Sequence, residues 1–406
     1  MGLIENLKSY SEEIQISDDK KDLLDSFLSN GFPTTKDEEW KYTSLKKVIA
    51  NEYNIENKGQ VVDDSVIEKY SLGFENQIIF SDGKLINIPT IKGVSISGFS
   101  EFESNTNDSI LNLNKSLSQN GFTISIDKNT VVENPIEILF ISTTETNFSQ
   151  YRNLISIAEN AEVKFVERIQ NLNNSSSFVN NFTRINCDKN TKIEYNKIQN
   201  NTSESQLIDT VNVYQEQDST CDINTLIFGG SFTRNNLNFE QNGFNCESNM
   251  NGVSVLDNNQ LADNHTFVDH KSANCRSNEM YKGIYLDNSK GVFNGKIMVR
   301  PDAQKIDAFQ SNNNLLLSEN SSIDSKPQLE IYADDVKCSH GCTIGQLDAD
   351  ALFYMRSRGI GVEEAKAVLT YAFASEAIEN ISVDQVKLLS KKLLAQKLNV
   401  ELDFSV

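Results

Sequence analysis

Two cysteines and a histidine lie within five consecutive positions of the stretch KCSHGC, at Cys338, His340 and Cys342. The whole chain of 406 residues has only three histidines and six cysteines, so these residue types are scarce elsewhere. Thiolate sulfur and imidazole nitrogen are suitable ligands for zinc, iron and iron–sulfur clusters. Three donors are fewer than a closed structural site needs, so the spacing alone predicts half of a shared site, a transient site or only a tight turn at Gly341.

The remaining cysteines and histidines lie in the middle of the chain. We interpret the cysteines as core residues, because a small apolar thiol beside an asparagine turn packs readily inside a protein. His265 and His270 lie in the stretch DNHTFVDHK, each near an aspartate. Such pairs can bind a cation, but a single His–Asp hydrogen bond is the commoner arrangement. The cysteines interpreted as core residues are Cys187, Cys221, Cys246 and Cys275.

The composition limits what such sites can serve. The formal net charge of −20 repels nucleic-acid phosphates, so we expect no nucleic-acid partner. No apolar run approaches the length needed to cross a bilayer, so we expect no membrane association. The opening stretch MGLIENLKSYSEEIQ lacks the basic and apolar regions of a secretory signal. These features predict a cytoplasmic protein whose cysteines stay reduced.

The elements that must position KCSHGC follow from hydrophobic periodicity. Residues 1–74 carry helical signals: Leu24 and Phe27 share one face of a predicted helix that ends at Gly31. Trp40, the only tryptophan, is expected to anchor a helix against its neighbour. An N-terminal helical segment is therefore predicted.

Residues 75–345 change to short alternating runs cut by Asn, Asp, Ser and Gly, such as FTISI at positions 122–126. This alternation predicts strands, in a sandwich, a barrel or a solenoid. The stretches CESNMNGVSVLDN from Cys246 and CRSNEMYKGIYLDN from Cys275 share a Cys-x-Ser-Asn start and a Leu-Asp-Asn end, about thirty residues apart. Such a repeat favours a parallel β-helix with asparagines stacked at its corners.

Residues 346–406 return to helical patterns. Asp348 is expected to cap the first of three helices, and Ser382 with Gln385 to form a capping box for the third. The predicted fold is therefore mainly β, a parallel β-helix core flanked by N-terminal and C-terminal α-helical domains. KCSHGC then lies on a loop where the last strand leaves the solenoid, and reactive side chains on such loops are often functional.

A long stretch around KCSHGC resembles a known signature. From GKIMVRPDAQKIDAF through KCSHGCTIGQLDADALFYMRSRGIGVEEA, the sequence is similar to the signature region of the SufB/SufD family of iron–sulfur cluster assembly proteins. CSHG, YMRSRGI and AFASE resemble the SufD branch more than the SufB branch, and PTTKDEEWKYT resembles the entry segment of the SufD branch. The helix–solenoid–helix order fits this resemblance over the whole chain.

The resemblance implies a non-catalytic scaffold that pairs with SufB through the two β-helices and binds the SufC ATPase by its C-terminal helices, within residues 346–406. By position, Cys338 and His340 match the pair that faces SufB where a transient iron–sulfur cluster or iron is held. Cys342 is an additional candidate metal ligand. ATP is expected only through SufC, because the sequence has no Gly-rich phosphate loop. A flavin is left open as a cofactor, and so is a homodimer in the absence of SufB.

Two other classes of function stay open on the residues alone. A zinc-dependent or redox-active β-helix protein could use Cys338 and Cys342. Parallel β-helices also include polysaccharide lyases and hydrolases, which need clustered acids or a basic residue in a groove. Such enzymes are usually secreted, so the expected absence of a signal argues against that class.

Overall fold

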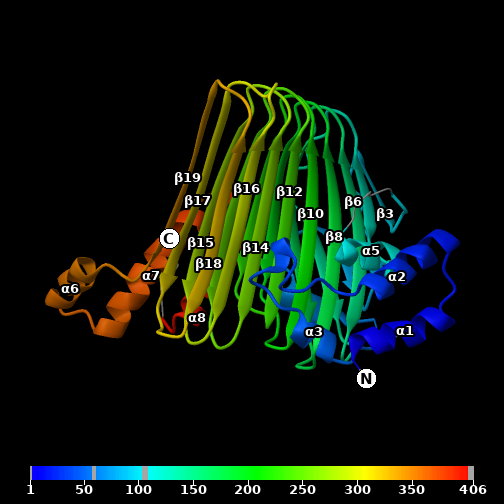
Figure 1. Cartoon of the computed structure of the whole chain (residues 1–406), viewed down its shortest axis with the longest axis horizontal. Helices are drawn as coiled ribbons and strands as arrows, with labels where there is room; N and C mark the ends of the chain where they lie inside the picture. The colour runs from blue at the N-terminus through cyan, green and yellow to red at the C-terminus, as the bar shows by residue number, and fades with distance from the viewer. Residues whose placement is uncertain (1, 57–60, 103–107, 401–406) are drawn as a thin grey trace.

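The computed structural model describes residues 2–56, 61–102 and 108–400, and its central feature is a β-solenoid of about eight turns over residues 123–345. Each turn contributes one strand to each of two largely parallel sheets that run the length of the solenoid (Figure 1). Helices precede and follow the solenoid in the chain. The prediction of a mainly β fold, a parallel β-helix flanked by helices, is confirmed.

In the described chain, the first sheet has ten strands in the order β19-β17-β15-β13-β11-β9-β7-β5-β1-β2. Its pairs are parallel except β1 with β2, which is antiparallel. The strands are β1 (Asn76–Ser81), β2 (Lys84–Asn87), β5 (Ile136–Ser142), β7 (Glu162–Asn171), β9 (Lys192–Gln199), β11 (Thr220–Ile227), β13 (Glu247–Leu256), β15 (Arg276–Tyr285), β17 (Ile306–Leu316) and β19 (Val336–Gly345).

The second sheet has nine strands within the same described ranges, in the order β18-β16-β14-β12-β10-β8-β6-β4-β3. Its pairs are parallel except β3 with β4. The strands are β3 (Val94–Gly98), β4 (Phe122–Ile126), β6 (Phe148–Ile157), β8 (Ser177–Cys187), β10 (Ser205–Gln215), β12 (Phe232–Gln241), β14 (Leu261–His270), β16 (Lys290–Val299) and β18 (Ser322–Ile331).

The corners of the solenoid carry the expected asparagine ladder. Asn129, Asn160 and Asn190 have positive φ angles of 62°, 62° and 55°, a conformation that asparagine tolerates better than most residues. The Nδ2 atom of Asn160 donates to Oδ1 of Asn129 at 2.8 Å, and Nδ2 of Asn190 donates to Oδ1 of Asn160 at 2.9 Å. Equivalent corners of successive coils are therefore joined directly.

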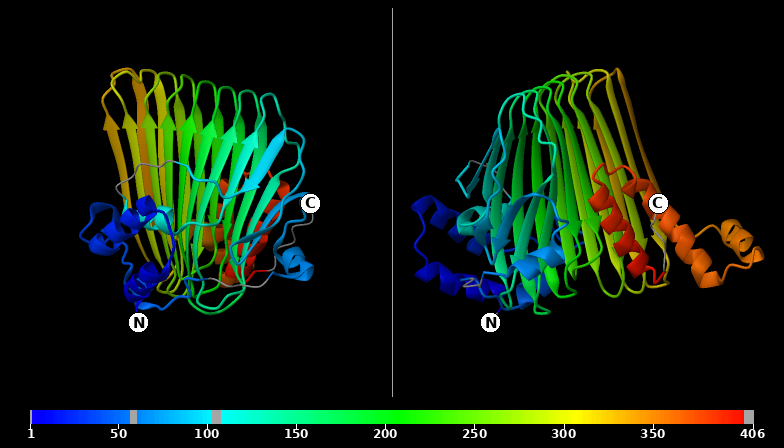
Figure 2. Two further views of the ribbon diagram at one scale, coloured as in Figure 1. Left: turned by 90° about the vertical axis from the view of Figure 1, so that its right-hand side faces the viewer. Right: turned by 180° about the vertical axis from the view of Figure 1, so that it is seen from behind.

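The N-terminal helices pack mainly on the outer face of the nine-stranded sheet (Figures 1 and 2). Trp40 belongs to this apolar cluster and also lies under the guanidinium of Arg234 on β12, which is 3.8 Å from the ring centroid. The tryptophan therefore fastens its segment to the solenoid. The elements are α1 (Leu3–Glu13), α2 (Asp18–Asn30), the 3-10 turn η1 (Glu38–Trp40), α3 (Lys46–Ala50), α4 (Asp64–Tyr70), which lies beside β5, and α5 (Ser109–Leu117).

The C-terminal helices are α6 (Ala349–Ser357), α7 (Val362–Ile378) and α8 (Asp384–Lys397). Helices α7 and α8 cover the outer face of the ten-stranded sheet, whereas α6 projects away from the solenoid (Figure 2). Asp348 caps α6 as predicted, accepting from the backbone N–H of Asp350 at 2.8 Å. None of the helices in the described part of the chain has the length and apolar character needed to span a membrane.

The predicted capping box at Ser382 and Gln385 is wrong. The residue that precedes α8 is Val383, and it makes no side-chain cap. Ser382 instead donates its backbone N–H to Glu194 Oε1 at 3.0 Å and its hydroxyl to the same carboxylate. Glu194 is a buried residue of β9, 188 positions earlier in the chain, so a distant acceptor competes successfully with the local cap.

Candidate functional site

The prediction that KCSHGC lies on a loop is wrong. The stretch lies within β19, the terminal strand of the ten-stranded sheet. The parallel ladder with β17 runs from Val336 to Gly345 without interruption and includes Ser339 and Gly341. These two residues are typical of turns, but strand pairing with the previous coil overrides that local preference. The candidate ligands therefore stand on a regular element at one end of the solenoid (Figure 1).

Strand alternation places Cys338, His340 and Cys342 on one face of β19. In the parallel register they follow Ala308, Gln310 and Asn312 of β17, whose side chains are buried in the solenoid. The three donors therefore occupy inward positions. Because β19 is the last strand of its sheet, His340 and Cys342 are exposed and Cys338 is half-buried.

The two cysteines of β19 have different surroundings. Cys338 packs against an apolar cluster that includes Ala308 and the buried Cys246 and Cys275. Burial raises the pKa of Cys338, and the nearby Asp307 carboxylate raises it further. The uncomplexed Cys338 therefore holds its proton, which a bound metal ion would displace.

Cys342 is engaged by hydroxyl and amide groups. Its Sγ lies 3.2 Å from Oγ of Ser325 on β18, and that hydroxyl donates to Oδ1 of Asn312 at 2.9 Å. Cys342 therefore has polar partners of its own on both sheets.

The spacing of the donors suits an incomplete site. Alternate residues on one strand are separated by about 6.7 Å, whereas ligands of one ion must come within roughly 2.0–2.3 Å of it. Within the described residues, no group of three or more His, Cys, Asp or Glu side chains is arranged to hold a metal ion. The donors of β19 thus offer ligands that side-chain rotation and a partner could bring to a common centre.

Comparison of the sequence with known proteins identifies the family of the chain. Residues 140–373 match the family model described as "SUF system FeS cluster assembly, SufBD core domain". The chain belongs to the SufBD family. The matched range runs from β5 into α7 and therefore includes all of β19 and the KCSHGC stretch.

Three relatives extend the similarity beyond the SufBD core. The chain is 30% identical to "Iron-sulfur cluster assembly protein SufD" of Escherichia coli K12, over 90% of this chain and 89% of the relative. It is 27% identical to a SufBD family protein of Synechocystis, over 89% and 85%, and 26% identical to "Protein ABCI7, chloroplastic" of Arabidopsis thaliana, over 89% and 82%. The chain is thus a SufD-like protein of SUF iron–sulfur cluster assembly.

The two other histidines of this SufBD protein have structural partners. His265 of β14 lies between two carboxylates: Nε2 is 2.9 Å from Oδ1 of Asp263, and Nδ1 is 3.3 Å from Oε2 of Glu39. Burial opposes a charge on the ring, but Asp263 and Glu39 outweigh it and raise the pKa of His265. The imidazole therefore ties the η1 segment to the solenoid.

His270, at the end of β14, is fully buried, and its Nε2 lies 3.0 Å from Oγ of Ser277. Within the described residues, the predicted His–Asp hydrogen bond is therefore found for His265 and not for His270. The interpretation of the four inner cysteines as core residues is confirmed, because each is at most 1% exposed and lies in an apolar cluster; they are Cys187, Cys221, Cys246 and Cys275.

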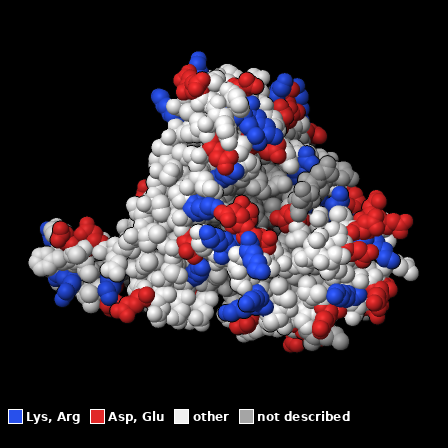
Figure 3. Space-filling view, in the orientation of Figure 1, with Lys and Arg blue, Asp and Glu red and all other residues white. Residues whose placement is uncertain are grey.

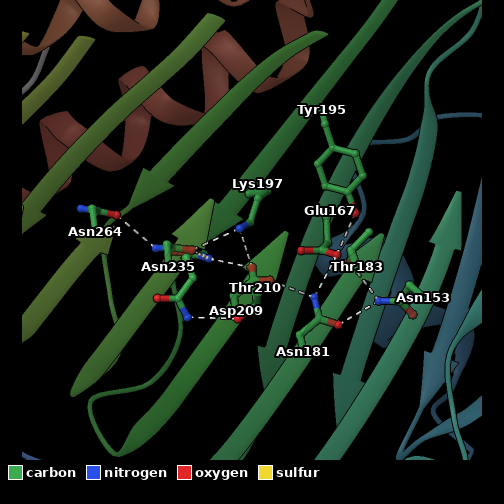
Figure 4. A network of polar contacts seen from close by, with 12 residues as sticks. Asn153, Glu167, Asn181, Thr183, Tyr195, Lys197, Asp209, Thr210, Asn235 and Asn264 are labelled. Carbon is green, nitrogen blue, oxygen red and sulfur yellow. Dashed lines mark hydrogen bonds and ion pairs between the residues drawn. The ribbon is translucent and has the colours of Figure 1, made fainter. Parts of the chain in front are cut away.

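The sequence analysis missed a polar network inside the SufBD core (Figure 4). Nζ of Lys197 is 2.7 Å from Oδ2 of Asp209, and the hydroxyl of Tyr195 donates to Oε2 of Glu167 at 2.9 Å. Burial and the Asp209 carboxylate raise the pKa of Glu167 to about 7. Amide and hydroxyl groups extend the network along the axis, namely Asn153, Asn181, Thr183, Gln199, Asn235 and Asn264.

One sequence signal could have revealed this network. In VKFVERI and KIEYNKI, the charged Glu167 and Lys197 stand two positions after the inward aromatics Phe165 and Tyr195. Alternation therefore assigns both charges to the interior. Neighbouring parallel strands pair Glu167 with Lys197 in register, so opposite charges meet inside the solenoid.

Proposed function

We propose that this chain is the SufD-type scaffold subunit of a SUF complex, and that Cys338 and His340 help to hold a nascent iron–sulfur cluster or iron at a seam with SufB. The observation that carries this proposal is the position of soft and imidazole donors on the inward face of the terminal strand. The family match and the similarity to proteins named for iron–sulfur cluster assembly support it.

The chemistry fits a cluster that is cargo and must leave. Thiolate sulfur binds iron more strongly than neutral imidazole does, so Cys338 is the first proposed ligand and His340 the second. Cys342 is a weaker candidate because Ser325 and Asn312 already engage its sulfur. A site that two chains complete can release its cargo when the chains move apart, whereas a closed cage of four ligands retains it.

Pairing with SufB is proposed at the open end of the solenoid. Edge strands β18 and β19 present backbone groups that another sheet can pair with. Apolar side chains are exposed on the last two coils: Phe309 of β17 is 46%, Ile344 of β19 51% and Tyr332, which follows β18, 62% exposed. The flank toward β19 also carries few charged side chains in the view of Figure 3. In the absence of SufB, a second copy of this chain is the alternative partner for the same edges.

Binding of the SufC ATPase is proposed on α6 and the start of α7. Phe353 and Tyr354 of α6 are 72% and 57% exposed, and α6 stands away from the solenoid. Large apolar side chains exposed together on one helix are typical of an interaction surface. ATP hydrolysis then belongs to SufC and this chain acts as a non-catalytic scaffold, with the cytoplasm as its proposed location.

The proposed function is tested by purifying the complex of this chain with SufB and SufC without oxygen, and by measuring its cluster content by absorbance and iron assay. His340→Ala and Cys338→Ser are each expected to leave a folded complex that hydrolyses ATP. The cluster content of this complex should fall by a factor of about ten or more. Cys342→Ser is expected to have a mild effect. The buried Cys246→Ala serves as the matched control and should load normally.

Two outcomes would contradict the proposal. Normal cluster loading in the double variant Cys338→Ser, His340→Ala would reduce KCSHGC to a structural strand. Stoichiometric zinc in place of iron in the anaerobically purified protein would favour a zinc-dependent function for the same residues.

A further inference from the structure

A single row of side chains leads from the interior of the solenoid to His340. Glu279 of β15, Gln310 of β17 and His340 of β19 are consecutive partners in the parallel register. Parallel strands lie about 4.8 Å apart, so each of these residues is the immediate neighbour of the next. Glu279 and Gln310 are 0% exposed, so only the last member of the row reaches the open end.

The hydrogen bonds of this row fix the direction of the Gln310 amide. The hydroxyl of Thr266 donates to Oε2 of Glu279 at 2.6 Å, and Nε2 of Gln310 donates to the same oxygen at 3.1 Å. An ionised carboxylate can only accept, so Gln310 must turn its nitrogen toward Glu279. The amide oxygen points away from that nitrogen and is buried without a hydrogen-bond partner among the described residues.

Protonation of Glu279 preserves this direction. Burial raises the pKa of Glu279 to about 7. Both of these hydrogen bonds to the carboxyl group end on Oε2, while Oε1 has no hydrogen-bond partner in the part of the chain that the structure describes. A proton on Oε1 therefore leaves Oε2 free to accept from Gln310, and the orientation of the amide persists on both sides of the titration.

Gly295 of β16 has no side chain, and the Gln310 amide occupies the space that a side chain at this position would need. A Cβ atom at Gly295 would lie 2.3 Å from Nε2 and 2.8 Å from Cδ of Gln310, so any larger residue would displace the amide. The side chain of Gln310 is thus held from one side by Glu279 and from across the lumen by the Gly295 backbone.

We propose that Gln310 positions His340, with its Oε1 accepting a hydrogen bond from one imidazole nitrogen. The other ring nitrogen then keeps its lone pair for the incoming iron. Histidines that bind metals commonly donate their second N–H to an oxygen, which fixes the tautomer and the ring orientation. The metal-binding consequence rests on the proposed function, whereas the hydrogen bond is a property of this chain alone.

The first test reads the tautomer of His340 in the isolated chain, without metal, by ¹⁵N NMR of histidine-labelled protein above the imidazole pKa. The chain has three histidines, so His340→Ala assigns the signal. The wild type should hold one tautomer predominantly. Gln310→Leu should shift the ratio to that of a KCSHGC peptide, and an unchanged ratio would overturn the proposal.

Matched variants separate positioning from loss of packing. Gln215→Leu also removes a fully buried glutamine from the solenoid, and it should leave the His340 tautomer unchanged. The exchange Glu279→Gln with Gln310→Glu keeps the charge inside and still presents an oxygen to His340, so it should restore the wild-type tautomer. Failure of this exchange to restore it in a folded protein would also count against the proposal. If Gln310→Leu does not fold, Gln310→Met replaces it with the same expected shift.

The second test measures iron affinity of the complex with SufB and SufC. Gln310→Leu is expected to weaken iron binding about tenfold or more, and the exchange variant to recover most of the loss. Unchanged iron affinity in Gln310→Leu would overturn the role in metal binding. A tautomer shift in Gln310→Leu together with normal cluster loading in His340→Ala would support the positioning contact but refute the proposed function.

Discussion

A lysine and an aspartate lie almost completely out of solvent in the middle of the solenoid. The side chains of Lys197 and Asp209 are 2% and 0% exposed. Asp209 also accepts from Gln199 and Asn181, each at 3.2 Å. Removing charges from water is costly, and such a pair is tolerated only when nearly every donor and acceptor finds a partner. The full set of polar contacts in Figure 4 meets that condition for Asp209.

Lys197→Met should destabilise the protein by about 3–5 kcal/mol, because it leaves the Asp209 carboxylate buried without its counter-charge. The double variant Lys197→Met, Asp209→Asn removes the uncompensated charge and should recover at least half of the loss. Urea unfolding of the three proteins measures both effects. Equal stability of the single and double variants would show that the ion pair is not the source of the cost.

The stability of the protein should depend on pH through Glu279. Its pKa is raised to about 7 by burial, against about 4.3 in an unfolded chain. The folded state thus keeps a proton that the unfolded chain has released, so the contribution of Glu279 is present at low pH and is lost as pH rises to 7. Its polar neighbours, Thr266, Gln310 and the phenol of Tyr281, stay neutral over this interval.

Glu279→Gln should remove this dependence. Between about pH 4.5 and 7.5, the wild type should lose roughly 3 kcal/mol of unfolding free energy relative to the variant. Urea unfolding of both proteins at a series of pH values measures the difference. Parallel pH profiles for the two proteins would show that Glu279 keeps an ordinary pKa in the folded state.

At the scale of elements, the sequence was sufficient where the pattern is local and repeated. Alternation in FTISI and the asparagine corners predicted the coils, and Asp348 predicted the start of α6. It failed where a distant partner decides the outcome. Ser382 bonds Glu194 of β9 rather than capping α8, and KCSHGC pairs with β17 rather than forming a turn. The same limit hid the Gln310 row, since its contacts join residues about thirty positions apart.

Helix α6 is expected to be the docking element for the SufC ATPase. Phe353→Asp should abolish SufC binding in a pull-down, because it places a charge in the proposed apolar contact. Since Phe353 is 72% exposed, the free energy of unfolding should change by less than about 0.5 kcal/mol. Leu388→Asp on α8, where the leucine is 41% exposed, is the matched control and should bind normally. Full SufC binding by Phe353→Asp would exclude this surface.

Point variants are better suited to this test than removal of the C-terminal helices. Helices α7 and α8 pack on Leu226, Val253 and Ile284 of the ten-stranded sheet. Deleting residues 361–406 would therefore expose an apolar sheet face as well as remove the start of α7, while it leaves α6 in place. A loss of SufC binding after that deletion would have two explanations.

At the scale of the whole molecule, the solenoid has two unlike ends. Toward the N-terminus, its sheets finish with the short antiparallel strands β2, which packs beside α4, and β3, which lies near α2 and α5 (Figure 1). Toward the C-terminus, they finish with β18 and β19, each ten residues long and parallel to its neighbour. In a stack of coils each coil is stabilised by its neighbours, so the last coil has support on one side only.

Backbone amides of β19 should therefore exchange with deuterium faster than those of β11 in the isolated chain, because β11 is paired on both sides with β9 and β13. Addition of SufB should slow exchange in β18 and β19 and leave β11 unchanged. Hydrogen-exchange mass spectrometry measures all three strands. If protection from SufB appeared elsewhere and not on β18 and β19, the proposed pairing surface would be refuted.

The difference between the two ends of the solenoid also limits how many copies can assemble end to end. A solenoid with two pairable ends could add further copies head to tail and extend into a fibre, as open heterologous contacts do. Among the described strands, long parallel edges occur only at the end formed by β18 and β19. A second solenoid that pairs with these edges covers them, so the assembly stops at two. Pro327 in the middle of edge strand β18 adds a barrier to indiscriminate pairing. The chain can thus keep a reactive edge for its partner without becoming a seed for polymerisation.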